Sequence, residues 1–206
     1  LFGMGLERVA YRPLRDSPRI SIMISAIGAS FLIENLAIVL FDARPKAFPV
    51  PDFFASTFVL GDVHISMVSI IIPVVTAIIL AALLWVIYRT KTGMAMRAVA
   101  TDIDAARLMA IDVNRIISFT FAIGSALAAV GGIMWALKYP RLEPLMGIMP
   151  GLKCFIAAVI GGIGSIAGAV LGGLLLGIIE LMTIAFLPEF TGYKDAFAFV
   201  LLIVVL

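Results

Sequence analysis

The sequence predicts an all-α integral membrane protein, a polytopic helical bundle of about five to six membrane segments that include one glycine-broken pair. Of its 206 residues, 63% are hydrophobic and only 14% are charged, whereas roughly 25% are charged in an average soluble domain. Several apolar runs reach the roughly 20 residues that a helix needs to cross a bilayer. These runs lack the strict apolar–polar alternation of membrane β-barrel strands, so the membrane segments are predicted to be helices.

Three runs in the first two thirds of the chain have the length of one membrane crossing. They cover residues 20–41, 65–88 and 116–137. The second run is interrupted only by Pro73, and the third carries no charge. Each run is therefore predicted to form one helix across the membrane.

The last third of the chain predicts a pair of shorter elements. Residues 154–187 contain a single charge, Glu180, and as one helix they would be about 51 Å long, far more than one crossing requires. The sequence Gly-Gly-Ile-Gly-Ser at 161–165 favours a bend. We therefore expect elements at 145–163 and 166–187, which either cross the membrane twice or form a re-entrant pair.

The two ends of the chain predict a fragment. The run at 197–206 has ten apolar residues, too few to span a bilayer, and the first residue is Leu1. A helix that ended inside hydrocarbon would leave carbonyl groups without hydrogen-bond partners. We expect one transmembrane domain over residues 1–206 that lacks both of its natural ends.

Basic residues predict the orientation of the segments in the membrane. Segments 1–19 and 89–115 hold four and five of the fifteen Lys and Arg residues, whereas segment 42–64 holds two. Because basic loops stay in the cytoplasm, the first two segments are expected to face the cytoplasm as loops and the third to face outward.

The composition also excludes several classes of function. A net charge of +2 argues against a nucleic-acid partner. One cysteine, Cys154, and one histidine, His64, cannot build a disulfide framework, a metal site or a Cys/His nucleophile within the chain. The chain also lacks a Gly-x-x-x-x-Gly-Lys-Ser/Thr phosphate-binding loop. We therefore expect no enzyme activity, no metal and no cofactor in this chain.

Segment 89–115 is the longest polar stretch, and it predicts a short amphipathic helix in the cytoplasm. Residues 101–104 offer side-chain oxygens that can cap a helix. Helical spacing then predicts one apolar side, while Asp104 and Arg107 can pair on the other side. The residues expected on the apolar side are Ala105, Ala106, Leu108 and Met109. The helix is either a solvated connector on the membrane surface or a docking element for a cytoplasmic partner.

Small residues recur at every fourth position in two predicted membrane segments. One stripe contains Gly164, Gly168 and Gly172, and the other contains Gly124 and Gly132 with two alanines between and after them. Such stripes let helix backbones approach closely in a membrane. They predict either tight packing alone or helices that slide across each other during transport.

Two acidic residues lie inside predicted membrane helices, where charges normally face a cavity or a partner. Glu34, followed by Asn35, is a candidate for a translocation pathway or a proton site, although a hydrogen bond between helices through Asn35 is an equal alternative. For Glu180, the sequence pattern indicates no chemical role. Backbone groups at the predicted bend can also face a charged substrate, because broken helices at membrane depth line cavities. The candidates there are Gly161, Gly162, Gly164 and Ser165.

Segment 104–110 carries a resemblance to a known family. Asp104-Ala105-Ala106, three further residues and Ala110 resemble the coupling motif Glu-Ala-Ala, three residues, Gly of ABC importer permeases. The neighbouring segments are similar in order to the branched-chain amino acid permeases of the LivH type. These segments are E-R-V-A-Y-R-P-L-R at 7–15, T-G-M-A-M-R-A at 92–98, G-L-K-C-F at 151–155 and A-V-I-G-G-I-G-S at 158–165. Asp104 is shorter than the motif's Glu, and Ala110 replaces its Gly, so the turn after the helix is expected to differ.

The resemblance implies a transport subunit in the plasma membrane of a prokaryote, from which about the first third, with its opening membrane helices, is absent. It implies four further partners: a second, LivM-like permease subunit, two cytoplasmic ATPase subunits that bind ATP, and an extracytoplasmic binding protein. It also implies that Asp104, Ala105, Ala106, Arg107 and Ala110 couple the permease to the ATPase. The expected cargo is a branched-chain amino acid.

Two alternatives remain open. Related permeases with the same framework carry urea, short amides or other small solutes. An ion-coupled secondary transporter or channel would instead use Glu34 for the coupling.

Overall fold

The computed structural model describes residues 2–14, 17–51, 54, 57–60, 63–162, 164–186, 192, 196, 199, 200 and 203. They belong to two compact units, Leu1–Pro144 and Leu145–Leu206. Of the apolar run predicted at 197–206, only residues 199, 200 and 203 are among the described ones.

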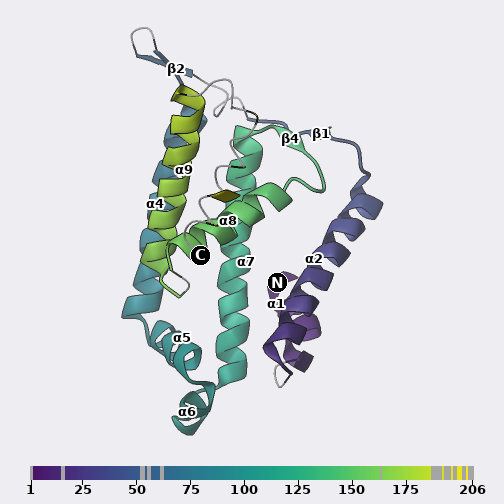
Figure 1. The fold of residues 1–206 in the computed structure, drawn as a ribbon, viewed down its shortest axis with the longest axis vertical. Coiled ribbons are helices and arrows are strands. Elements are labelled where there is room, and N and C mark those ends of the chain that lie inside the picture. The colour runs from purple at the N-terminus through teal and green to yellow at the C-terminus, as the bar shows by residue number, and fades with distance from the viewer. Residues whose placement is uncertain are drawn as a thin grey trace. The chain divides into compact units, whose positions relative to one another are not determined.

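Three long helices form the frame of the first unit (Figure 1): α2 (Arg19–Phe41), α4 (Met67–Arg89) and α7 (Val113–Lys138). Together with α9 (Ile166–Phe186) of the second unit, four helices in the described part of the chain are long and apolar enough to cross a membrane. This finding confirms the predicted all-α polytopic class. The predicted boundaries at 20–41, 65–88 and 116–137 differ from the observed helices by at most three residues.

The apolar side chains of these helices point mostly outward. On α2, for example, Phe31, Leu32 and Val39 are exposed, and on α9 Leu171 and Leu181 are exposed. Helices with this pattern would expose a large apolar surface in water, but the surface matches a lipid environment or neighbouring membrane subunits. The four helices therefore identify an integral membrane protein.

The N-terminal segment is helical, which differs from the cytoplasmic loop predicted for residues 1–19. It consists of α1 (Phe2–Leu6), a π-helix η1 (Glu7–Tyr11) and a 3₁₀ helix η2 (Arg12–Leu14). A Cβ atom on Gly3 would overlap the hydroxyl of Ser125, and the buried carboxylate of Glu7 accepts a hydrogen bond of 2.7 Å from Ser118 Oγ. The cytoplasmic side of this segment stays a prediction, and the charge count does not register that Glu7 is buried against α7.

Two antiparallel ribbons complete the first unit. β1 (Lys46–Ala47) pairs with β4 (Arg141–Leu142), with Lys46 opposite Leu142. β2 (Thr57–Leu60) pairs with β3 (Val63–Ser66), with Thr57 opposite Ser66. In Figure 1, β1 and β4 lie at the end of the unit opposite the short helices α5 (Lys91–Thr101) and α6 (Ile103–Leu108). The segments after α2 and after α7 therefore meet at one end, away from the segment that links α4 to α7.

The second unit is a helical hairpin of α8 (Ile148–Ile160) and α9 (Ile166–Phe186). The break between the helices falls within the predicted bend at 161–165. By helical rise, the 13 residues of α8 cover about 20 Å and the 21 residues of α9 about 31 Å. Only α9 is therefore long enough to cross the hydrocarbon core.

Candidate coupling and translocation sites

Three side chains cap the first residues of the helices α5, α6 and α7. Thr90 Oγ1 accepts a hydrogen bond of 3.1 Å from the backbone N–H of Gly93 at the start of α5. Asp102 Oδ1 accepts from the N–H groups of Asp104 and Ala105, at 2.9 and 3.0 Å, at the start of α6. Asp112 Oδ1 accepts from the N–H of Arg115 at 3.1 Å and begins α7. Side-chain oxygens at these positions satisfy N–H groups that have no partner within the helix.

Helix α6 buries one side chain and exposes its last ones. Ala106 is 3% exposed and packs in a cluster with Val99 and Val113, whereas Leu108 is 89% exposed and the following Met109 is 77% exposed. The prediction that Ala105, Ala106, Leu108 and Met109 share one side is therefore wrong. Positions two apart lie on opposite sides of a helix, and Met109 already leaves the helical conformation as its C-cap.

The exposed residues Asp104, Arg107, Leu108 and Met109 form a surface that we call the α6 tip. Asp104 Oδ1 and Arg107 Nη1 lie 3.5 Å apart and both side chains are exposed, so the pair contributes little to folding stability. Figure 1 shows α6 beyond the ends of α4 and α7, on the far side of α5. The α6 tip thus exposes two apolar side chains and one pair of charges. The buried side chain of Ala106 packs α6 against the rest of the first unit.

The turn after α6 has the backbone form that glycine usually provides. Ala110 has a φ of 57°, in the left-handed region, and its N–H donates to Arg107 O at 3.1 Å. The next N–H, of Ile111, donates to Ala106 O at 3.2 Å and closes the helix end. Alanine adopts the left-handed form here at a cost of about 1 kcal/mol, and that the turn differs from that of the motif's glycine stays a prediction.

Replacing Ala110 with glycine is therefore expected to stabilise the turn. The Ala110→Gly variant removes the clash between Cβ and the backbone in the left-handed region, so we expect the free energy of unfolding to rise by about 0.5–1 kcal/mol. Thermal unfolding of the purified permease in detergent measures the change. Ala105→Gly, at an exposed position within α6, is the control and is expected to lower stability by about 0.5–1 kcal/mol.

The hairpin of the second unit is closed by backbone contacts between small residues. A Cβ atom on Gly168 would overlap Gly161 O, and one on Gly172 would overlap Ala157 O. Gly162 and Gly164 have φ values of 90° and 99° and make the turn, a conformation that side chains other than glycine rarely adopt. Ser165 Oγ accepts from the N–H of Gly168 at 3.1 Å at the start of α9.

An ion pair joins the two helices of the hairpin. Lys153 Nζ on α8 and Glu180 Oε1 on α9 lie 2.8 Å apart, and the side chains are 22% and 21% exposed. Sequence reasoning missed Lys153, because the apolar run with a single charge begins one residue later, at Cys154. Its position three residues before the buried Ile156 is the signal that places it on the packed side of a helix.

The remaining candidate residues are on α2 and α7. Glu34 accepts a hydrogen bond of 3.1 Å from Ser30 Oγ, and Asn35 Nδ2 donates to Phe31 O at 2.7 Å, so the hydrogen bonds described for both residues lie within α2 itself. On α7, Cβ atoms built on Gly124 and Gly132 would have open space within 4 Å. The small-residue stripe of α7 therefore presents these two glycines to open space in the described structure.

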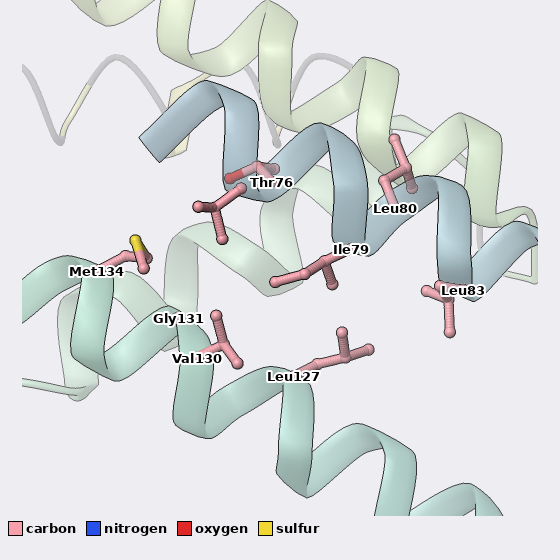
Figure 2. Close-up of a pocket in the computed structure, with 9 residues that line it drawn as sticks. Thr76, Ile79, Leu80, Leu83, Leu127, Val130, Gly131 and Met134 are labelled. Carbon is pink, nitrogen blue, oxygen red and sulfur yellow. The ribbon is translucent and has the colours of Figure 1, made fainter. Parts of the chain in front are cut away.

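An apolar pocket of about 250 Å³ lies between α4 and α7. Figure 2 shows side chains of the two helices that face each other across it, among them Ile79 from α4 and Leu127 from α7. Its lining offers the Thr76 hydroxyl as a polar side-chain group and includes none of the predicted translocation residues. A pocket of this chemistry suits aliphatic groups and not a charged head group.

Comparison with known proteins adds a second line of observation. The family described as the branched-chain amino acid transport system / permease component matches residues 1–206. The high-affinity branched-chain amino acid transport system permease protein BraD of Pseudomonas aeruginosa is 45% identical over all of this chain and 67% of its own length. The corresponding protein LivH of Escherichia coli is 42% identical, with the same coverage. The fructose import permease protein FrcC of Rhizobium meliloti is 31% identical over 63% of this chain and 36% of its own length. No solved structure matches the chain.

Proposed function

The chain belongs to the family of branched-chain amino acid transport permease components, and from this membership we propose that it carries branched-chain amino acids across the inner membrane of a prokaryote. It acts as a permease subunit of an ATP-binding-cassette importer. Its relatives BraD and LivH are named as permease proteins of high-affinity branched-chain amino acid transport systems. The chain itself is the transport subunit and not the ATP-hydrolysing enzyme.

The observation that carries the coupling part of this proposal is the α6 tip. Leu108 and Met109 are almost fully exposed at the end of a short helix, and apolar side chains in such a position are typical of a protein interface. Ala106 holds the helix to Val113, the first residue of α7. A partner that binds the tip and moves can therefore shift α7. We assign this partner role to two cytoplasmic ATPase subunits, which bind and hydrolyse the ATP.

The outward apolar faces of the long helices support two further contacts. One is the lipid bilayer, and the other is a second permease subunit, which pairs with this chain to form the path. An extracytoplasmic binding protein delivers the amino acid at the opposite side of the membrane. In this arrangement the binding protein captures the amino acid, the two permease subunits form the path, and the ATPase subunits supply the energy.

Each unit has its own candidate for the translocation path: the polar pair on α2 in the first unit and the hairpin bend in the second. At the bend, Gly162 and Gly164 have φ values of 90° and 99° that interrupt the helical run, and backbone groups at such a break can face a charged substrate. Glu34 and Asn35 place a carboxylate and an amide in an apolar helix. Because the hydrogen bond described for each of them lies within α2, both side chains can turn toward a second subunit or a substrate without breaking contacts between helices.

Uptake by the complete transporter tests this function. Proteoliposomes that contain the full-length permease with its partner subunits and binding protein are loaded with ATP and given radiolabelled leucine. We expect uptake that orthovanadate stops and that a protonophore leaves unchanged, because the energy comes from ATP hydrolysis. The opposite pattern would favour the ion-coupled alternative, and uptake of urea or an amide without leucine would favour the small-solute alternative.

A further inference from the structure

The end of α4 and the start of α5 carry a group of positive charges to which the proposed function gives no role. Arg89 ends α4, Lys91 and Arg97 belong to α5, and all three side chains are exposed. The sequence contains no Asp or Glu from residue 67 to residue 101. Among the described residues, no acidic side chain forms an ion pair with any of the three. Residues 85–97, which we call the α4–α5 corner, therefore present positive charge that these residues do not compensate.

The first turn of α5 folds back against the last turn of α4. A Cβ atom on Gly93 would overlap Val86 O and Ile87 O, so the two helices are in backbone contact there. One turn further along α5, the guanidinium carbon of Arg97 lies over the ring of Tyr88, 5.2 Å from its centroid. Figure 1 shows α5 next to the lower end of α4. The charge of Arg97 therefore lies at the level of the last turn of a membrane helix.

Helix length and exposed aromatic rings place this level at the boundary between hydrocarbon and head groups. The 23 residues of α4 rise by about 34 Å, slightly more than the roughly 30 Å of the hydrocarbon core. Trp85 and Tyr88 are exposed near the end of α4, and aromatic rings with a polar edge are typical of the membrane interface. On α5, the exposed Met94 lies between Lys91 and Arg97 at helical spacing. The α4–α5 corner thus offers apolar contacts and positive charges at the same depth.

The contact with Tyr88 leaves Arg97 able to bind an anion. An aromatic ring face attracts the guanidinium without using up its N–H donors, as a carboxylate partner would. Two of these donors can bind two oxygens of one phosphate group, a geometry that the planar guanidinium favours. Arg89 and Lys91 add positive charge on either side of the turn between the two helices. The chemistry of the α4–α5 corner therefore matches a phosphate group attached to an apolar body.

We propose that the α4–α5 corner binds the phosphate head group of an anionic phospholipid in the leaflet that it faces, which the basic loops predict to be the cytoplasmic one. The Arg97 guanidinium donates to phosphate oxygens, and Arg89 and Lys91 compensate the negative charge. The first carbons of the acyl chains lie against Trp85 and Tyr88. Phosphatidylcholine carries its own positive charge and has no net charge, so the α4–α5 corner prefers phosphatidylglycerol. The site depends on the membrane and not on the solute that the permease carries.

Binding of two lipids with the same acyl chains measures this preference. The full-length permease is purified in detergent, and native mass spectrometry follows its adducts as phosphatidylglycerol or phosphatidylcholine is titrated. We expect the wild-type permease to bind phosphatidylglycerol at lower concentrations than phosphatidylcholine. The Arg89→Gln/Lys91→Gln/Arg97→Gln variant should bind phosphatidylglycerol roughly a hundredfold more weakly, because each basic residue near the membrane surface adds to the attraction of an anionic lipid.

The control removes the same number of positive charges from the β1–β4 end of the first unit. Arg44, Lys46 and Arg141 are exposed at or next to this ribbon. The Arg44→Gln/Lys46→Gln/Arg141→Gln variant therefore has the net charge of the first variant and should keep the wild-type affinity for phosphatidylglycerol. Equal losses in both variants would show a general effect of net charge, and unchanged binding by both would leave the α4–α5 corner without a lipid. Either result would overturn the proposal.

A labelled lipid tests the position of the site in the wild-type protein. Phosphatidylglycerol with a diazirine near the top of one acyl chain is added in trace amounts to phosphatidylcholine vesicles that contain the full-length permease. After irradiation, we expect more adducts on the peptide with Trp85, Tyr88 and Met94 than on α2, and unlabelled phosphatidylglycerol should remove this excess. Equal labelling of both peptides, or displacement by inorganic phosphate, would overturn the proposal. Loss of the adducts on assembly with the ATPase subunits would also overturn it and assign the α4–α5 corner to a protein interface.

Discussion

Replacing Leu108 and Met109 together with aspartate is expected to abolish binding of the ATPase subunits to the permease. Each side chain is almost fully exposed at the α6 tip, and buried apolar anchors of an interface typically contribute about 2 kcal/mol each. Loss of both anchors, with two carboxylates placed in the interface, corresponds to roughly a thousandfold weaker association. Leucine uptake should fall with it, because the proposed function supplies energy to the permease through this contact.

Co-purification of the ATPase with tagged permease measures this loss. The conservative exchange Leu108→Met/Met109→Leu keeps both positions apolar and should retain the ATPase and the uptake. Ala106→Asp gives a different result: Ala106 is buried against Val99 and Val113, so a carboxylate there should lower the thermal stability of the permease itself. Normal association of the double aspartate variant would rule out the α6 tip as the docking surface.

Replacing Gly172 with valine is expected to prevent α8 and α9 from closing as a hairpin. Even the first carbon of a side chain at this position would overlap the backbone carbonyl of Ala157 and come within 3.0 Å of Gly161 N. Backbone atoms cannot move aside as a flexible side chain can, so we expect a loss of about 3 kcal/mol or more in folding stability and little folded protein in the membrane. Uptake should be lost in proportion to the missing protein.

Gly177→Val provides the matched control on the same helix. A Cβ atom there would have no neighbour within 4 Å, so this variant changes the same residue type without a clash. We expect wild-type amounts of folded permease, measured by fluorescence-detected size-exclusion chromatography. If Gly172→Val and Gly177→Val behave alike, the close contact between α9 and Ala157 does not determine the fold of the hairpin.

Composition and periodicity were sufficient to predict most of the helical framework. A crossing helix requires about 20 apolar residues, so the runs at 20–41 and 116–137 correspond closely to α2 and α7. The bend at 161–165 was predictable because a single helix of that length does not fit the bilayer and because glycine accepts the backbone angles of a tight turn.

The candidate sites were less predictable, because they depend on which face of a helix is covered. Ala106 and Leu108 are both apolar, and only packing against Val99 and Val113 reveals that one is buried and the other exposed. Lys153 adjoins the polar segment before it, and only the hairpin register brings it to Glu180. The hydrogen bond of the buried Glu7 could not be predicted for the same reason, because its donor, Ser118, lies more than a hundred residues further along the chain.

The ion pair of the hairpin also has an electrical consequence. One elementary charge that moves across a membrane potential of 100 mV gains or loses about 2.3 kcal/mol. Because α8 and α9 carry one positive and one negative charge held 2.8 Å apart, the hairpin as a whole carries no net charge through that field. The membrane voltage would therefore contribute little to a tilt or shift of the two helices together.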